Sequence, residues 1–447
     1  MIPVAHDAER RLNAVDLALV VIFLAGIYLG IALQITPTIP MPAMPAGFTG
    51  VILLWRRRDD ITPSHLAALL VVLLCYIGSI LSAGNYAFLI KRFTGLIQLT
   101  YSLMIGYALF LTLVRASRDQ LAHLFMSFSL LLLFGALLES YGGLRPISDA
   151  VRQHLYSRGV YDADLRDEIL YGRIRPKFFA SEPSAVTFGY TLFAFGWLAT
   201  TRWRWKYVGY LGLLAVGVVA LPGPTLLLML LLAVPVELFL SGGSNRSAAR
   251  AIKIAVMSVM VIIAFAWAST SIFSQRFRDI SQGNDPSFFF RVTGPALIAI
   301  DVMHRHPWAG SGLTAENYIA DEIMNVYMRS GIFYSGWQFE KVSDSITNYF
   351  WLHWIYLGVI WGVIVVVALN FWLKVLGVSN TVFCWMVWAI LGQASGAYVS
   401  PKTWTVFLLA AAAAVVRRQQ PAQAGAVQRA PRAYGGTVLA SGRLLRS

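Results

Sequence analysis

The chain has 447 residues, of which 57% are hydrophobic and 13% are charged. Soluble globular proteins carry about 25% charged residues, so roughly half of the usual charge is missing. The mean hydropathy is +0.63, and the chain contains fourteen tryptophans. These figures exclude disordered, collagen-like and disulfide-stapled chains, and Cys75 and Cys384 both lie inside apolar runs. They indicate an all-α fold, a polytopic integral membrane helical bundle.

Twelve apolar runs are separated by polar segments. Each run is expected to be a helix, because backbone polar groups in lipid must be paired within their own segment. The predicted membrane helices cover residues 15–33, 41–55, 65–83, 93–114, 121–139, 183–200, 207–221, 225–240, 252–273, 346–372, 381–397 and 404–416. Together they form one membrane domain over residues 1–416, and the tail 417–447, rich in Ala, Gly, Pro and Arg, is expected to be disordered. Arg10 and Arg11 precede the first run without a small-residue cleavage site, which favours a retained helix over a signal peptide.

Lysines and arginines in the short loops predict the orientation, because short cytoplasmic loops are enriched in them. If the N-terminus is cytoplasmic, fourteen precede the tail on the cytoplasmic side, and three, Lys91, Arg92 and Lys402, occupy short loops on the other side. Both termini are then cytoplasmic, and two long loops, residues 140–182 and 274–345, lie outside and contain short helices. The net charge of +14 therefore reflects membrane topology more than nucleic-acid binding.

The first long loop ends in a basic segment, Arg-Ile-Arg-Pro-Lys-Phe-Phe-Ala-Ser-Glu-Pro-Ser, over residues 173–184. In an extended chain Arg173, Arg175 and Lys177 share one side, by the two-residue period. Three aligned cations at a membrane surface suit a polyanionic headgroup such as a diphosphate. Ordinary interfacial anchoring by long basic side chains explains them equally well.

Glu182 opens the helix 183–200, with Ser181 as a candidate N-cap and Pro183 in the first turn. Two interpretations of this carboxylate remain open. It can complement the positive end of the helix dipole, which is a structural role. It can also accept a proton from a sugar hydroxyl at the membrane edge, which is a catalytic role.

The second long loop carries Arg276, Arg278 and Arg291. Arg291 is followed by an apolar helix that starts at Pro295 and runs for about nine residues, too short to span a bilayer. That helix is expected to pack on the bundle or lie in the interface, and its N-terminus next to Arg291 offers an anion site. His304 and His306 are two residues apart and do not share a helix face, so no metal pair is expected there.

Together, these loops resemble the bacterial O-antigen polymerase and ligase superfamily, which handles undecaprenyl-diphosphate-linked glycans. The resemblance includes the layout of twelve spans with a large late outer loop, across nearly the whole chain. Three motifs carry it: Glu182-Pro183-Ser184 after a basic loop; Arg291, a helix and His306-Pro307-Trp308-Ala309-Gly310-Ser311-Gly312; and Asn348-Tyr349-Phe350-Trp351-Leu352 running into Gly358 and Gly362.

The resemblance implies a metal-independent glycosyltransferase without a cofactor. Polymerases of the family move a growing glycan from undecaprenyl diphosphate onto a lipid-linked repeat unit, whereas ligases move the glycan onto lipid A core. Ligases typically carry His before the Asn of the late motif, where this chain has Thr347. The Glu-Pro-Ser element is more like that of O-antigen, capsule and exopolysaccharide polymerases. We therefore expect a polysaccharide polymerase at the periplasmic face of the bacterial inner membrane, with an O-antigen ligase as the alternative.

Individual residues have expected roles in such a polymerase. Glu182 and Arg291 are the expected catalytic residues. The expected substrate-binding residues are Arg173, Arg175, Lys177, Lys91, Arg92, Arg276, Arg278, His306 and Asn348. The expected partners are a lipid-diphosphate oligosaccharide, membrane lipid, and chain-length regulator and flippase proteins, with no nucleic acid. A polysaccharide transporter or lipid flippase is the competing class, but its polar residues would lie at mid-membrane rather than at the outer edge.

Overall fold

The computed structural model describes residues 11–36, 39–156, 161–240, 274–330 and 346–419, together with residues 255, 259, 262, 266 and 342. Within these residues the chain is mostly helical. The predicted helix 252–273, apart from four of its residues, and the tail beyond residue 419 lie outside the described part. Each of the other eleven apolar runs contains a helix.

The helices begin and end close to the polar boundaries of the runs. In chain order they are α1 (Ala14–Leu29), α2 (Met44–Arg56), η1 (Arg58–Asp60), α3 (Pro63–Ser82), η2 (Tyr86–Phe88), α4 (Leu89–Leu113), α5 (Arg118–Tyr141), α6 (Arg145–Leu155), α7 (Asp164–Tyr171), α8 (Pro183–Thr200), α9 (Lys206–Ala220), η3 (Pro224–Leu227), α10 (Leu228–Pro235), η4 (Val236–Leu240), α12 (Ser274–Ser281), α13 (Pro286–Phe288), η5 (Phe289–Thr293), α14 (Gly294–Arg305), η6 (Glu316–Ile319), α15 (Ala320–Arg329), α16 (Tyr349–Val375), α17 (Thr381–Gly392) and α18 (Pro401–Gln419). The segments η4 and η5 are π-helical.

Two of the runs end earlier than their apolar composition suggests. Gly30, with φ 67°, ends α1 four residues inside the expected span, and an antiparallel hairpin of β1 (Leu33–Thr36) and β2 (Ile39–Met41) follows. The helix α17 stops at Gly392 instead of residue 397. Gly30, which is in the left-handed region, and Gly392 account for the two endings, because glycine favours helix termination.

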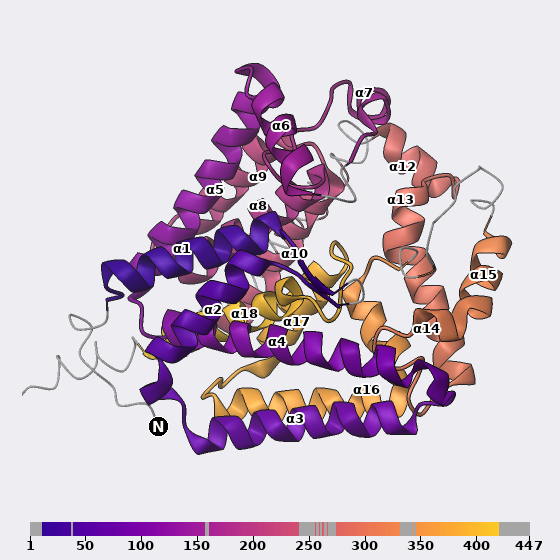
Figure 1. The fold of residues 1–447 in the computed structure, drawn as a ribbon. Helices are drawn as coiled ribbons and strands as arrows, with labels where there is room; N and C mark the ends of the chain where they lie inside the picture. The colour runs from indigo at the N-terminus through magenta and orange to yellow at the C-terminus, as the bar shows by residue number, and fades with distance from the viewer. Residues whose placement is uncertain are drawn as a thin grey trace, which may run out of the picture.

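Five helices of the described residues are long and apolar enough to cross a membrane: Pro63–Ser82, Tyr86–Leu113, Arg118–Tyr141, Pro286–Arg305 and Tyr349–Val375. The chain therefore has the make-up of a helical membrane protein. Among the shorter apolar helices, α1 packs on α2, α10 packs on α17 and α8, and α17 packs on α18. In Figure 1, α3, α4 and α16 lie along one side of the bundle, and the chain reverses direction from α3 to α4.

The segment Pro286–Arg305 differs from the expected short helix of about nine residues after Arg291. It is helical over 20 residues, because α13, η5 and α14 follow one another without a break. In Figure 1, α12 to α14 run down one side of the molecule, across the direction of α3, α4 and α16. Arg291 consequently lies inside the π-helical segment η5, one turn past the start of the helix, and not at a helix N-terminus.

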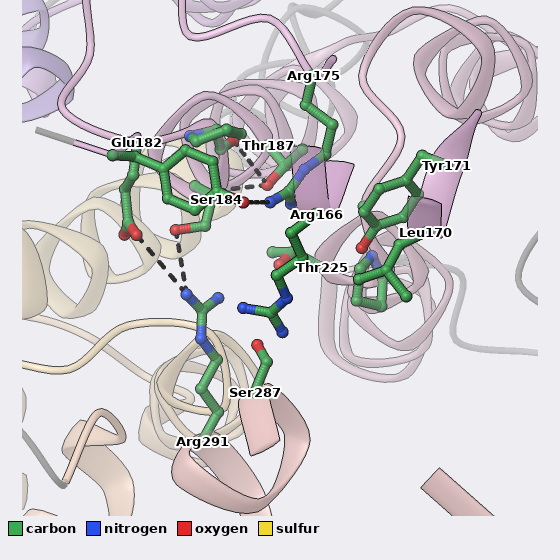
Figure 2. Close-up of a pocket in the computed structure, with 14 residues that line it drawn as sticks. Arg166, Leu170, Tyr171, Arg175, Glu182, Ser184, Thr187, Thr225, Ser287 and Arg291 are labelled. Carbon is green, nitrogen blue, oxygen red and sulfur yellow. Dashed lines mark hydrogen bonds and ion pairs between the residues drawn. The ribbon is translucent and has the colours of Figure 1, made fainter. Parts of the chain in front are cut away.

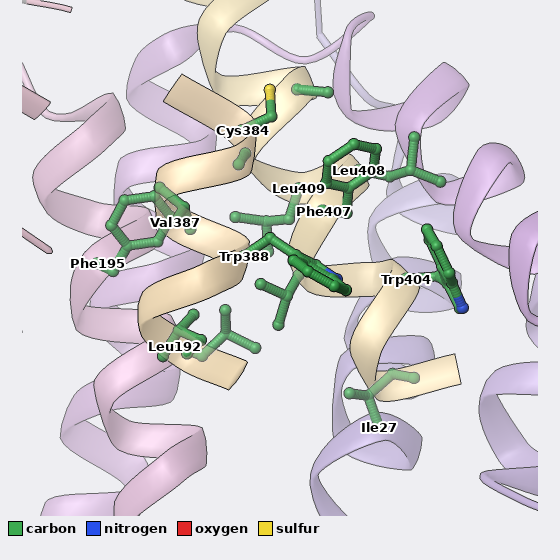
Figure 3. Close-up of a cluster of buried hydrophobic side chains, with 14 of the residues drawn as sticks. Ile27, Leu192, Phe195, Cys384, Val387, Trp388, Trp404, Phe407, Leu408 and Leu409 are labelled. Atoms are coloured by element: carbon green, nitrogen blue, oxygen red, sulfur yellow. The ribbon is translucent and has the colours of Figure 1, made fainter. Parts of the chain in front are cut away.

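The centre of the bundle is formed by α8, α17 and α18. Every residue of α8 from Val186 to Thr200 is buried, as is α18 from Thr403 to Val416. Figure 3 shows Trp388 of α17 beside Trp404 and Phe407 of α18, with Phe195 of α8 on the other side of α17. The run of alanines at 410–414 presents a thin surface, which allows the neighbouring helices to approach closely.

A break in α16 anchors the glycine-rich turn that follows α14. Gly358 has φ 64° and ψ −167°, so the helical hydrogen-bond ladder is interrupted there. The freed groups pair with the turn: Val359 N and Ile360 N donate to Pro307 O at 2.8 and 3.0 Å, Ser311 N donates to Ile355 O at 2.9 Å, and Gly312 N donates to Tyr356 O at 3.0 Å. A Cβ on Gly310 would lie 2.2 Å from Ile355 O. The His-Pro-x-x-Gly-x-Gly segment is thus a turn that packs against the break in α16 through backbone hydrogen bonds.

Candidate functional site

The backbone that leads into Glu182 is a tight turn held by several side-chain hydrogen bonds. Phe178 and Phe179 have φ values of 33° and 63°, a conformation that costs bulky residues free energy. The buried carboxylate of Glu139 accepts hydrogen bonds from the N–H groups of Lys177, at 2.9 Å, and Phe178. Tyr28 donates its hydroxyl proton to Phe178 O at 2.7 Å. These contacts hold the strained turn in one conformation.

A buried arginine fixes the next residues of the same segment. Arg152 of α6 is 1% exposed and donates to Ala180 O at 2.7 Å and to Ser181 O at 2.9 Å. Its charge is compensated by Asp149, at 2.6 Å. Because the side chain is enclosed and all three contacts are internal, Arg152 positions the chain before Glu182 instead of offering its charge to solvent.

Glu182 is itself the N-cap residue of α8, so the expected cap at Ser181 is wrong. The Glu182 side chain makes no capping hydrogen bond to the helix. Its Oε2 lies 3.8 Å from Arg291 Nη2 of η5, and the same nitrogen lies 3.4 Å from Ser184 Oγ. The Glu182 side chain is 45% exposed and that of Arg291 is 29% exposed. The structure therefore brings the two expected catalytic residues together from loops far apart in the sequence.

The π-helical segment that carries Arg291 is held by the start of α16. Asn348 Nδ2 donates to Arg291 O at 2.7 Å and to Gln393 Oε1 at 2.9 Å, while its Oδ1 caps α16 by accepting from Phe350 N and Trp351 N. Thr347 Oγ1 donates to Phe290 O at 3.1 Å. Asn348 is 0% exposed, so it acts on the backbone of Arg291 and does not reach a ligand.

Glu182 and Arg291 line a pocket, called here the first pocket, with an empty volume of about 510 Å³. Arg166 and Arg175 also line it, together with Ser287 and several small or polar side chains. Figure 2 shows the guanidinium groups of Arg166 and Arg291 both projecting into this space. The lining holds three arginines and one carboxylate, Glu182, so the pocket is strongly positive.

The three arginines differ in how much of their charge is already paired. Arg175 forms a 2.8 Å ion pair with Asp167, which is 0% exposed, and its guanidinium also lies over the ring of Tyr171. Arg291 has a long ion pair with Glu182, at 3.8 Å, and a 3.4 Å hydrogen bond to the uncharged Ser184. Within the part of the chain that the structure describes, Arg166 has no ion-pair partner. Unpaired and weakly paired guanidinium groups facing one space suit a multiply charged anion.

The charges around Glu182 determine its ionisation. Partial desolvation raises the pKa of Glu182, but the charge of Arg291, a hydrogen bond with Ser184 and two further cations lower it by more, so the pKa lies below the ordinary 4.5. Glu182 is therefore ionised at neutral pH. An ionised carboxylate beside a cationic pocket can accept a hydrogen bond from a hydroxyl group and take up its proton during a reaction.

Of the three cations expected to share one side of the first loop, Arg175 and Lys177 both lie over the ring of Tyr161, whereas Arg173 lies elsewhere. Arg175 lines the first pocket, as described above. Lys177 is buried and forms a 2.8 Å ion pair with Asp164. Arg173 donates to the Tyr141 hydroxyl and to Val219 O, outside the pocket. Each of the three side chains pairs with a different neighbour, so a shared side in the sequence does not make them one binding site.

The remaining expected binding residues lie away from this pocket. Lys91 pairs with Glu316 at 3.5 Å, and Arg92 is 0% exposed with its guanidinium bonded to backbone carbonyls, among them Ser311 O at 2.9 Å. His306 Nε2 lies 3.4 Å from Glu322 Oε1. Arg278 is exposed on α12, and the side chain of Arg276 lies outside the described part. Arg92 thus fastens the glycine-rich turn instead of binding a ligand.

Arg166 was not expected from the sequence. It lies on α7, whose sequence Asp-Leu-Arg-Asp-Glu-Ile-Leu-Tyr is typical of a solvated amphipathic helix. Only the packing of α7 beside η5 and α8 shows that this side chain lines the first pocket. The sequence does contain one indication of this role. Arg166 is the basic residue of a helix in which acidic residues are more numerous.

A second pocket also reaches Glu182, with an empty volume of about 500 Å³. It is bounded by the end of α1, the start of α2, and the first turns of α8 and α18. Ser181, Ser400 and Lys402 contribute polar groups, and Glu182 is the residue common to both pockets. Lys402 Nζ sits 4.3 Å above the ring of Phe188.

The arrangement combines a pocket lined by three arginines, a carboxylate at its edge and a second polar cavity. Among the described residues, no group of three or more His, Cys, Asp or Glu side chains is placed to hold a metal ion. No protein-family model matches the chain, and no curated protein is similar to it.

Proposed function

We propose that this protein is a glycosyltransferase that moves a glycan from a lipid diphosphate onto a lipid-linked repeat unit, and so elongates a polysaccharide. The observation that supports this most directly is the meeting of Glu182 and Arg291 at one pocket, with Arg166 and Arg175 alongside. The leaving group of such a reaction is a diphosphate, and three arginines in one pocket provide the charge to stabilise it. The motif resemblance described above points to the same chemistry.

The reaction is a single displacement. The acceptor oxygen bonds to the anomeric carbon while the bond from that carbon to the diphosphate oxygen breaks, and its electron pair stays on the diphosphate. The hydroxyl proton passes to Glu182, which later releases it to water. Of the residues that the structure describes, Glu182 is the only carboxylate that lines the first pocket. One carboxylate suits a single displacement, whereas double displacement uses a second as nucleophile.

The polymerase assignment, as opposed to transfer to lipid A core, rests on the late motif. Ligases of the superfamily carry a histidine where this chain has Thr347. Here the Thr347 hydroxyl donates to the carbonyl of Phe290 and so supports the segment that carries Arg291. We place the site on the outer face of the bacterial inner membrane with both termini in the cytoplasm, since the short-loop charges favour that orientation.

Purified protein in lipid nanodiscs tests the proposal. With a fluorescent lipid-diphosphate oligosaccharide as the sole substrate, we expect a ladder of longer lipid-linked chains. A strain lacking the gene should lose long polysaccharide and retain single-repeat species. If long lipid-linked chains accumulate unattached in that strain, the protein is a ligase. If the purified protein moves the substrate between leaflets and forms no glycosidic bond, it is a flippase.

Orientation is tested separately. Asn317 is exposed on η6, within the second long loop. In a variant that lacks Cys75 and Cys384, Asn317→Cys should react with a membrane-impermeant maleimide on spheroplasts. Labelling only after lysis would invert the proposed topology.

A further inference from the structure

Glu182 forms part of the wall of two separate cavities. The first pocket brings it to Arg291, at 3.8 Å, and the second brings it to the start of α18. Lys402 of α18 adds to the positive potential at the Glu182 carboxylate. No other residue lines both pockets. A group bound in either cavity is therefore adjacent to the same carboxylate.

We propose that the second pocket binds the sugar end of the acceptor and presents its hydroxyl to Glu182 from the side opposite the arginines. This inference rests on the proposed function. A single displacement requires the nucleophile to approach the anomeric carbon on the face away from the leaving group. With the diphosphate held by Arg166, Arg175 and Arg291, a second cavity that borders Glu182 offers the acceptor an approach away from those arginines. The second pocket is a cavity of suitable size that also reaches Glu182.

The groups in the second pocket suit a neutral, hydroxyl-rich ligand. Ser181 and Ser400 supply hydroxyls, and Lys402 supplies one ammonium, which within the described residues has no ion-pair partner. Among the described residues no arginine lines this pocket, in contrast to the three in the first. Sugar hydroxyls both donate and accept hydrogen bonds, so they match mixed polar groups of this kind, whereas a diphosphate is better held by several guanidinium groups.

The wall opposite Glu182 is conformationally constrained. Ala43, which precedes α2, has φ 54°, and Gly30, which ends α1, has φ 67°. An alanine in this left-handed region is strained, and strain of this type concentrates where a binding surface must keep a fixed shape. Gly30 and Ala43 thus give the part of the pocket wall that they form a defined shape.

A pair of matched substitutions separates the two pockets. Ala185 of α8 lines only the second pocket, and Ser287 of α13 lines only the first. Ala185→Leu and Ser287→Leu each add a similar volume to one cavity. The donor is a lipid-diphosphate oligosaccharide whose terminal acceptor hydroxyl has been removed, so that it cannot be extended. The acceptor is a fluorescent repeat unit on a short-chain lipid diphosphate.

We expect Ala185→Leu to raise the acceptor KM about tenfold or more and to leave the dissociation constant of the deoxy donor within about twofold of the parent. Ser287→Leu should do the reverse. Free repeat-unit oligosaccharide should compete with the acceptor in the parent and lose that ability in Ala185→Leu. If Ala185→Leu does not fold, Lys402→Gln should raise the acceptor KM about fivefold with donor binding retained.

The outcomes distinguish the inference from the function on which it rests. If the parent forms glycosidic bonds and both Ala185→Leu and Lys402→Gln keep the parental acceptor KM, the second pocket is not the acceptor site and the proposed function stands. If lipid diphosphate without sugar is the better competitor, the pocket binds an anion and the inference is wrong. If the parent forms no glycosidic bond, the proposed function fails, and the acceptor assignment fails with it.

Discussion

Arg291→Ala is the substitution that tests the candidate site most directly. The Arg291 guanidinium faces a pocket with two other arginines, and hydrogen bonds to charged groups are worth about 1.5–3 kcal/mol each. Because about 1.4 kcal/mol corresponds to a tenfold change in rate, losing this contact to the departing diphosphate should lower kcat about tenfold to a hundredfold. Arg291→Lys should recover only part of this, since an ammonium cannot bind two phosphate oxygens in a fork.

The same substitution should have little effect on folding. The Arg291–Glu182 pair is separated by 3.8 Å and both side chains are partly exposed, so it contributes at most about 1 kcal/mol to stability. The assay is chain elongation in nanodiscs, with thermal unfolding measured on the same samples. Arg173→Ala is the matched control, because Arg173 lies in the same basic segment but outside the pocket. Equal loss of activity in both variants, or full activity in Arg291→Ala, would refute the assignment.

Three further predictions concern the surroundings of Glu182 and Arg291. Because the pKa of Glu182 lies below 4.5, elongation should stay independent of this group as pH falls until that lowered pKa is reached, and the acid limb of a pH–rate profile should move to higher pH in Arg291→Ala. Asn348→Asp keeps the cap on α16 but loses the donor to Arg291 O, so kcat should fall about tenfold, whereas Asn380→Asp at the cap of α17 should retain parental activity. Gly358→Ala should lower the unfolding free energy by about 2 kcal/mol or more in a detergent melt, because its Cβ would lie 2.7 Å from His306 O and Pro307 O; an unchanged melting temperature would contradict the docking role of this break.

Apolar runs predicted the helices well because the signal is local. Eleven runs contain helices, and their errors occur at glycines and at one connection, where a hairpin replaces the last turn of the first run. The underestimated helix after Arg291 has a similar cause. The sequence favours a helix start at Pro295. In the structure Pro295 follows Gly294 inside a continuous helix, and the π-helical turn at η5 accommodates the proline. Proline is favoured at helix starts without being confined to them.

The roles of individual cations were harder to predict, because they depend on backbone carbonyls and acids that are distant in sequence. Arg92 looked like a ligand-binding residue on a short outer loop, yet its guanidinium reaches the carbonyl of Ser311, more than 200 residues away in sequence. Lys177 was expected to bind the same anion as Arg175, yet Asp164 neutralises the charge of Lys177. Arg166 looked like part of a solvated helix face and lines the first pocket. Composition indicates how many cations a loop carries, and only the packing decides which of them stay unpaired.

The position of Arg291 follows from a chain of contacts that starts in the membrane helices. The break at Gly358 in α16 fixes the glycine-rich turn, and Arg92 of α4 fastens that turn from the other side. At its own start, α16 holds Arg291 through Asn348. The helix α16 therefore contacts the chain on both sides of α14: the segment η5 before it and the glycine-rich turn after it. The position of Arg291 depends on α16 more than on its own segment. This explains why a charged residue on a long loop can face Glu182 at a defined distance without a strong ion pair to hold it there.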